Sequence, residues 1–218
     1  MPGMPRPRLH HPDDVLDHAR ALVLERGVRA ATIEAIAAAG RVPVGSLYHE
    51  FASRDDLLAR MWMRAARRSQ AAFCAAADHP DPREAAVAMA LSLFDFCVTD
   101  TGDARLLVSL RREDLLQTEP TADVFRELHE LNRPIEQSVS RLARRLHGGA
   151  AREARDEVLF AVFDLAYGAV RRDLLAGRTP SRSRRRQLER AVRAVVAETP
   201  AMSRTRRQRD DIPRGGSR

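Results

Sequence analysis

Signals that begin and end helices recur along the whole sequence, whereas no segment shows the strict alternation of apolar and polar residues typical of a strand. Thr32, Ser53 and Asp81 are good N-caps in front of apolar-periodic stretches, and Gly27 and Gly177 are good helix stops. The pattern therefore predicts an all-α fold of about nine helices. They are expected near residues 13–26, 32–39, 43–51, 53–77, 81–100, 103–116, 121–147, 152–176 and 181–198, with Pro134 as a kink or break.

The composition is that of a globular protein, with 44% hydrophobic and 31% charged residues among 218. The first residues contain no apolar segment of the kind found in signal sequences. The longest uncharged apolar run, residues 85–94, is about half of the ~20 residues that a membrane helix needs. We therefore expect a cytoplasmic protein without a membrane partner. Cys74 and Cys97 lack metal-ligand spacing and are expected to be buried free thiols.

The net charge of +7 comes from one end of the chain. Residues 178–218 contain 13 Arg and 4 acidic residues, whereas residues 1–177 contain 24 Arg and 26 acidic residues. Net charge therefore gives little support for a nucleic-acid partner by itself. We expect residues 199–218 to be a disordered basic tail and residues 1–12 to be a flexible leader.

Three of the expected helices are short and close together, and the second and third are joined by a tight turn, which is the spacing of a helix-turn-helix. On a helical wheel of the third helix, Leu47 and Phe51 face inward, while Gly45 and His49 point away. A helix this short is not stable by itself, so these two apolar side chains should dock on the first two helices. The outer strip would then be free to contact another surface.

Residues 31–58, ATIEAIAAAGRVPVGSLYHEFASRDDLL, resemble the DNA-binding domain of the TetR family of bacterial transcriptional regulators. The resemblance covers about residues 13–65 at unbroken spacing. It is carried by Thr32, Ile36, Ala37, Val42, Ser46, Leu47, Tyr48, Phe51, Ser53 and Arg54. The sequence departs from the family pattern at the turn, where Gly40 falls one place early and Arg41 stands in the usual position of Gly. It also departs at Pro43, in place of a Ser cap, and at Ala35, where the family often has an acidic residue.

The resemblance implies a repressor that leaves a pseudo-palindromic operator when it binds a small-molecule ligand. Its partners would be double-stranded DNA, a second copy of the chain and a ligand that the sequence does not identify. Residues 13–53 would form the helix-turn-helix domain, with the motif at about 32–51, and residues 54–198 a helical domain for ligand binding and dimerisation. No cofactor and no metal are expected.

The resemblance also assigns site residues. Phosphate contacts are expected from Thr32, Tyr48, His49 and Arg54, and contacts to base edges from Val44, Gly45 and Ser46. Because the outer strip lacks Arg, Asn and Gln, Arg41 in the turn is the predicted reader of guanine. The ligand pocket is expected to involve Trp62, Phe73, Met89, Phe94, Phe125, Phe160, Phe163 and Tyr167. The dimer interface is expected to involve Val170, Leu174, Leu188, Val192 and Val195.

Two other classes of function stay open at this point. One is a helical enzyme, although His129-Glu130 lacks the second His of a helical zinc motif, and no nucleophile or nucleotide-binding loop has a recognisable context. The other is a helical ligand-binding or adaptor protein that has lost specific DNA binding, which only Arg41 and Pro43 suggest. The sequence therefore favours the regulator, with no enzymatic activity.

Overall fold

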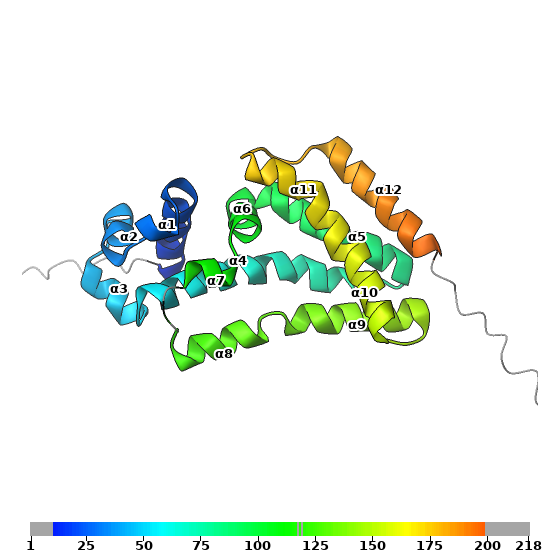
Figure 1. Cartoon of the computed structure of the whole chain (residues 1–218), viewed down its shortest axis with the longest axis horizontal. Coiled ribbons are helices and arrows are strands. Elements are labelled where there is room, and N and C mark those ends of the chain that lie inside the picture. The colour runs from blue at the N-terminus through cyan, green and yellow to red at the C-terminus, as the bar shows by residue number, and fades with distance from the viewer. Residues whose placement is uncertain (1–10, 117, 119, 199–218) are drawn as a thin grey trace, which may run out of the picture.

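The computed structural model describes residues 11–116, 118 and 120–198, and all regular structure within them is helical, as the sequence predicts. At one end of the molecule lies a small head, and the long helix α4 runs from it into a larger body (Figure 1). The first elements are α1 (Pro12–Arg26), η1 (Val28–Ala30), α2 (Ile33–Gly40), α3 (Val44–Glu50) and α4 (Arg54–Ala76). The leader before residue 11 and the tail after residue 198 lie outside the described residues.

The body contains the remaining helices, and three of the expected ones are divided. The segment expected at 103–116 forms two helices, the segment 121–147 breaks just before Pro134, and the segment 152–176 contains a π-helical turn. Proline lacks a backbone N–H and is tolerated in the first turn, which explains the break at Pro134. The elements are α5 (Pro82–Thr99), α6 (Thr101–Ser109), α7 (Arg112–Leu115), α8 (Ala122–Glu130), α9 (Arg133–His147), α10 (Arg152–Leu159), η2 (Phe160–Asp164), α11 (Leu165–Leu175) and α12 (Arg182–Glu198).

The predicted N-caps are confirmed. The Thr32 hydroxyl accepts from the backbone N–H of the third helical residue at 3.2 Å, and the Ser53 hydroxyl accepts from the equivalent N–H of α4 at 3.1 Å. The Asp81 carboxylate accepts from two N–H groups at the start of α5, and these bonds lower its pKa from the ordinary value. Such caps satisfy backbone donors that have no partner within the helix, which is why they mark helix starts reliably.

Each part of the molecule has its own apolar cluster, and α4 contributes to both. The head cluster joins α1, α2 and α3 to the first half of α4, and it includes Leu106 from α6. The body cluster joins α5, α9, α10, α11 and α12 to Phe73 near the end of α4. The head is therefore packed onto the body through one continuous helix, with α6 beside it.

A buried ion pair reinforces this connection. Asp103 of α6 is only 1% exposed, and its carboxylate binds Arg20 of α1 on one oxygen and Arg68 of α4 at 3.1 Å on the other. A second link joins α1 to α4, because Arg64 donates to the carboxylates of Asp13 and Asp17. The orientation of α1 relative to the body therefore depends on charged contacts as well as on packing.

No single helix of the described chain is long and apolar enough to cross a membrane. Only α5 and α6 taken as a pair meet that test of length and composition, and they are bent by 109° at their junction. Most residues of α5 are buried or half-buried among other helices.

Candidate functional site

Helix α3 is held to the head by its inward side chains, as the helical wheel predicts. Leu47 is 1% exposed and Phe51, which caps the helix, is equally enclosed. The opposite side of α3 is open to solvent, and a Cβ added at Gly45 would meet no atom within 4 Å. The expected contact residues therefore lie on an exposed face of one helix, which consists of Val44, Gly45, Ser46, Tyr48 and His49.

The turn before α3 explains the unusual position of the glycine. Arg41 adopts the left-handed conformation that helix ends usually assign to Gly, with φ 53° and ψ 41°, and its N–H closes the end of α2. Gly40 serves packing instead, because a Cβ there would lie 3.2 Å from the Val42 side chain and 3.5 Å from the ring of His18 on α1. The turn therefore keeps its geometry at the cost of a strained Arg41, whose side chain is exposed beside α3.

Arg54, which is expected to contact a phosphate, is hydrogen-bonded within the head. Its guanidinium donates to the Val28 carbonyl at 2.7 Å, to the Ala31 carbonyl at 2.9 Å and to the Asp55 carboxylate at 2.8 Å, and its side chain is only 17% exposed. These bonds hold the η1 turn against α4. The bonds use three of the five guanidinium N–H groups, so Arg54 has a structural role in the head, and its contact with a phosphate stays a prediction. Residue spacing contains no signal of this structural role of Arg54, since the two acceptor carbonyls belong to a turn more than 20 residues earlier.

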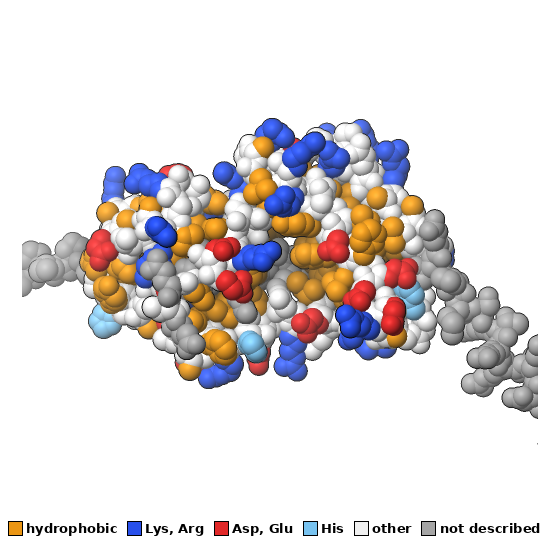
Figure 2. Space-filling view, in the orientation of Figure 1, with side chains coloured by type: hydrophobic (Ala, Val, Ile, Leu, Met, Phe, Trp, Pro, Cys, Tyr) orange, Lys and Arg blue, Asp and Glu red, His pale blue; other side chains and the backbone are white. Residues whose placement is uncertain are grey.

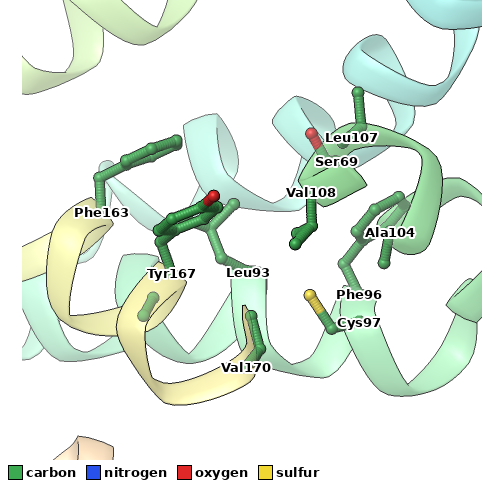
Figure 3. Close-up of a pocket in the computed structure, with 11 residues that line it drawn as sticks. Ser69, Leu93, Phe96, Cys97, Ala104, Leu107, Val108, Phe163, Tyr167 and Val170 are labelled. Carbon is green, nitrogen blue, oxygen red and sulfur yellow. The ribbon is translucent and has the colours of Figure 1, made fainter. Parts of the chain in front are cut away.

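A cavity of about 130 Å³ lies in the body, where α4, α5, α6 and the segment η2–α11 meet (Figure 3). Its walls are almost entirely apolar. The lining residues are Ser69, Leu93, Phe96, Cys97, Ala104, Leu107, Val108, Phe163, Ala166, Tyr167 and Val170.

Of the residues expected to form a pocket, Phe163 and Tyr167 line this cavity and the other six do not. Phe73, Met89 and Phe94 are fully enclosed in the apolar cores. Phe125 and Phe160 lie on the surface, where Phe125 stacks on His129 with ring centres 5.4 Å apart. Trp62 belongs to the head cluster and donates to the Leu110 carbonyl at 3.3 Å. The assignment of these six residues to a ligand site is not supported by this cavity and stays a prediction.

Three groups give the cavity its limited polarity. The Ser69 hydroxyl donates to the Ala66 carbonyl at 2.8 Å, so it can only accept from a ligand. The Tyr167 oxygen accepts from Nε of Arg171 at 3.1 Å, which leaves its own hydroxyl proton free to donate. Burial raises the pKa of the Cys97 thiol to about 12, so this group is protonated at neutral pH and is a poor nucleophile.

The residues expected at a dimer interface face the inside of the subunit. Val170, Leu174, Leu188 and Val192 are at most 3% exposed and belong to the body cluster, and Val195 packs against it. Ion pairs from α12 to α5 fix the inward face, since Arg185 binds Asp95 at 2.7 Å and Arg193 binds Glu84, which lowers the pKa of that carboxyl. Four of these positions therefore lie in the core of the subunit and Val195 is half-buried at its edge, and their place in a dimer interface stays a prediction.

Other apolar side chains of the same helices are exposed. Hydrophobic residues gather on the surface over α10 and α11 (Figure 2). They include Leu159, Phe160, Phe163, Tyr167 and Leu175. Contiguous exposed aromatic groups are costly on a monomer and are typical of an interaction surface.

Comparison with known proteins agrees with this geometry. Residues 15–61 match the sequence profile of bacterial regulatory proteins of the tetR family. Among curated proteins, none matches the chain significantly. Among the part of the chain that is described, no group of three His, Cys, Asp or Glu side chains could hold a metal ion.

Several solved structures share the fold over most of their length. A TetR-like transcriptional regulator from Rhodococcus sp. RHA1 is 20% identical, with a TM-score of 0.62, and the match covers 88% of this chain and 100% of the other. The regulator FadR of Bacillus subtilis in complex with stearoyl-CoA is 12% identical, with a TM-score of 0.64, and the match covers 87% of this chain and 100% of the other. A TetR-family regulator from Streptomyces coelicolor is 20% identical, with a TM-score of 0.64, and the match covers 86% of this chain and 88% of the other.

Proposed function

Because this chain carries the N-terminal domain of the tetR family on the fold of TetR-like regulators, we propose that it is a DNA-binding transcriptional regulator that responds to a small molecule. The observation that carries the proposal is the exposed face of α3. The helix docks on the head through the buried side chains of Leu47 and Phe51, and its opposite face is open to solvent. In a helix-turn-helix, this face enters the major groove.

The face divides into positioning and reading groups. Tyr48 is 54% exposed and can reach a phosphate, while the open surface at Gly45 lets the backbone approach the bases closely. Ser46 and Val44 offer a weak hydrogen bond and a contact to a thymine methyl group. Arg41 is the only strong hydrogen-bonding reader among these groups, so we assign it the recognition of a guanine.

Helix α6 offers a route from the ligand to the DNA. Ala104, Leu107 and Val108 of this helix line the cavity, while Asp103 binds Arg20 of α1 and Leu106 packs in the head cluster. A ligand that fills the cavity would displace α6, and α1 would move with it. Such a shift changes the separation of two heads in a dimer and so releases a two-part operator.

The proposed dimer uses the exposed apolar surface over α10 and α11 rather than the buried stripes. Phe160 is 48% exposed there, so Phe160→Glu should give a folded monomer in sedimentation experiments at micromolar concentration. Phe125→Glu is the matched control, because Phe125 is equally exposed on α8 and should leave the dimer intact. A dimer that survives Phe160→Glu would contradict this assignment.

Selection of binding sites from random double-stranded DNA tests the function itself. We expect an enriched pseudo-palindrome whose half-sites are separated by about one helical turn, or 10 base pairs, or a multiple of it. Val44→Glu should abolish the enrichment, since it places a carboxylate against the phosphates. Val98→Glu, at an equally exposed valine of α5, should not change it. If the wild-type chain enriches no sequence, the protein is an adaptor or an enzyme instead.

A further inference from the structure

The cavity in the body presents no formal charge to its contents. None of its eleven lining residues is acidic or basic, and the one titratable thiol, Cys97, is protonated at neutral pH. Arg171 donates from Nε to the Tyr167 oxygen at 3.1 Å, and it is not among the residues that line the cavity. Moving an ionised carboxylate into such walls would leave it without a partner, which is strongly unfavourable. The occupant is therefore uncharged.

The size of the cavity limits the occupant further. Its volume is about 130 Å³, and an apolar protein cavity of about 150 Å³ is known to bind benzene. Leu93, Phe96 and Val108 form walls from two helices, and Ala166 and Ala104 leave the space between them. A single six-membered ring fills the enclosed part of this space, whereas a long acyl chain or a fused ring system would extend beyond it.

The polar groups define what the ring must carry. Tyr167 has one hydroxyl proton free to donate, and Ser69 has only acceptor capacity left. Both residues line the cavity, Tyr167 from α11 and Ser69 from α4 (Figure 3). A hydroxyl group both donates and accepts, so one such group on the ligand satisfies both. A ketone only accepts and a protonated amine only donates, so either ligand would leave the Tyr167 or the Ser69 hydroxyl without a partner.

We propose that the cavity binds a phenol, that is, an uncharged molecule of one aromatic ring with one hydroxyl group, as the effector of the regulator. The assignment rests on the function proposed above, because it names the ligand class of the same cavity. Tyr167 is then the residue that distinguishes a hydroxylated ring from a plain one, and Ser69 orients the hydroxyl. Phe163 lies at the exposed edge of the cavity and covers the ring.

Isothermal titration calorimetry on the full chain tests the proposal with four probes: phenol, toluene, benzoate and stearoyl-CoA. We expect phenol to bind with a Kd of about 100 µM, a value suited to a ligand of so few atoms. Toluene should bind about 10-fold more weakly, because the hydroxyl of Tyr167 then has no partner on the ligand. Benzoate and stearoyl-CoA should not bind measurably.

Two variants and one control locate the site. Tyr167→Phe keeps the ring and removes the donor. The affinity for phenol should therefore fall to that for toluene, and the affinity for toluene should not change. Val108→Phe fills the cavity and should abolish binding of both. Ser92→Ala removes a hydroxyl of α5 that does not line the cavity, and should leave phenol binding unaltered.

Equal binding of phenol and toluene, an unchanged phenol affinity in Tyr167→Phe, or preferential binding of benzoate or stearoyl-CoA would each overturn the proposal. DNA binding is measured separately, so the two failures are distinguishable. A chain that selects a palindrome but ignores phenol keeps the proposed function and loses the ligand class. A chain that binds phenol but selects no DNA keeps the ligand class and loses its role as effector.

Discussion

The face of α3 and the cavity of the body achieve binding in opposite ways. The face is convex, carries small polar and half-exposed side chains, and depends on two docked residues, Leu47 and Phe51, for its position. The cavity is concave, apolar, and assembled from residues of four elements, none of which fixes it alone. A surface of the first kind tolerates changes in the body, whereas a cavity of the second kind changes shape whenever a helix shifts. This difference lets ligand binding in the body act on the position of a head that stays folded.

The strongest test of this division concerns the ion pair that joins the two regions. Asp103→Ala removes a buried carboxylate and leaves Arg20 and Arg68 without it, so we expect a loss of about 3 kcal/mol in the free energy of unfolding, measured in urea. Asp123→Ala is the control, because Asp123 pairs with Arg126 on the open surface and should cost less than about 0.5 kcal/mol. Equal effects would show that packing alone joins the head to the body.

A variant of Arg54 tests whether hydrogen bonds inside the head hold it in place. Arg54→Ala removes bonds to two carbonyls and one carboxylate, and we expect it to cost about 2 kcal/mol of stability. Operator affinity should fall with it, while the slope of log K against log salt stays unchanged. Arg29→Ala, at an exposed arginine of η1, is the matched control for the loss of charge. A slope reduced by about 0.9 would identify Arg54 as a phosphate contact after all.

Variants of Arg41 separate the effect of its backbone conformation from the effect of its side chain on the binding face. Arg41→Gly removes the guanidinium and relieves the left-handed strain, so the chain should become more stable by about 1 kcal/mol. Discrimination at one guanine per half-site should fall by about 1 to 2 kcal/mol. Arg41→Ala should show the same loss of discrimination without the gain in stability. Operator variants that keep their ranking in both mutants would exclude Arg41 as a reader.

A further expected effect concerns the cavity and appears only in alkali. Because burial raises the pKa of the Cys97 thiol from 9.0 to about 12, the folded state holds this proton more tightly than the unfolded state. Its contribution is complete below pH 9 and is lost as pH rises toward 12, at no more than about 1.4 kcal/mol per pH unit. Cys97→Ala should flatten this part of the stability profile.

Local chemistry made the order and starts of the helices predictable. A cap such as Thr32, Ser53 or Asp81 acts on N–H groups within three residues of itself, and the inward position of Leu47 follows from the period of its own helix. The resemblance to the family placed the exposed face of α3 on the same local grounds. These features need no knowledge of what the chain packs against, which is why the sequence determined them.

Tertiary structure decided which side chains the helices present to each other. Phe94 and Phe96 differ little in sequence context, yet Phe94 lies in the core and Phe96 lines the cavity, because the crossing of α5 with α6 and α11 selects between them. The π-helical turn η2 rotates α11 relative to α10, so a single helical wheel through residues 152–176 mixes two faces. The structural role of Arg54 was not predictable from the sequence for the same reason. Its three partners come together only in the folded head, and a long flexible side chain takes its role from the acceptors that folding brings within reach.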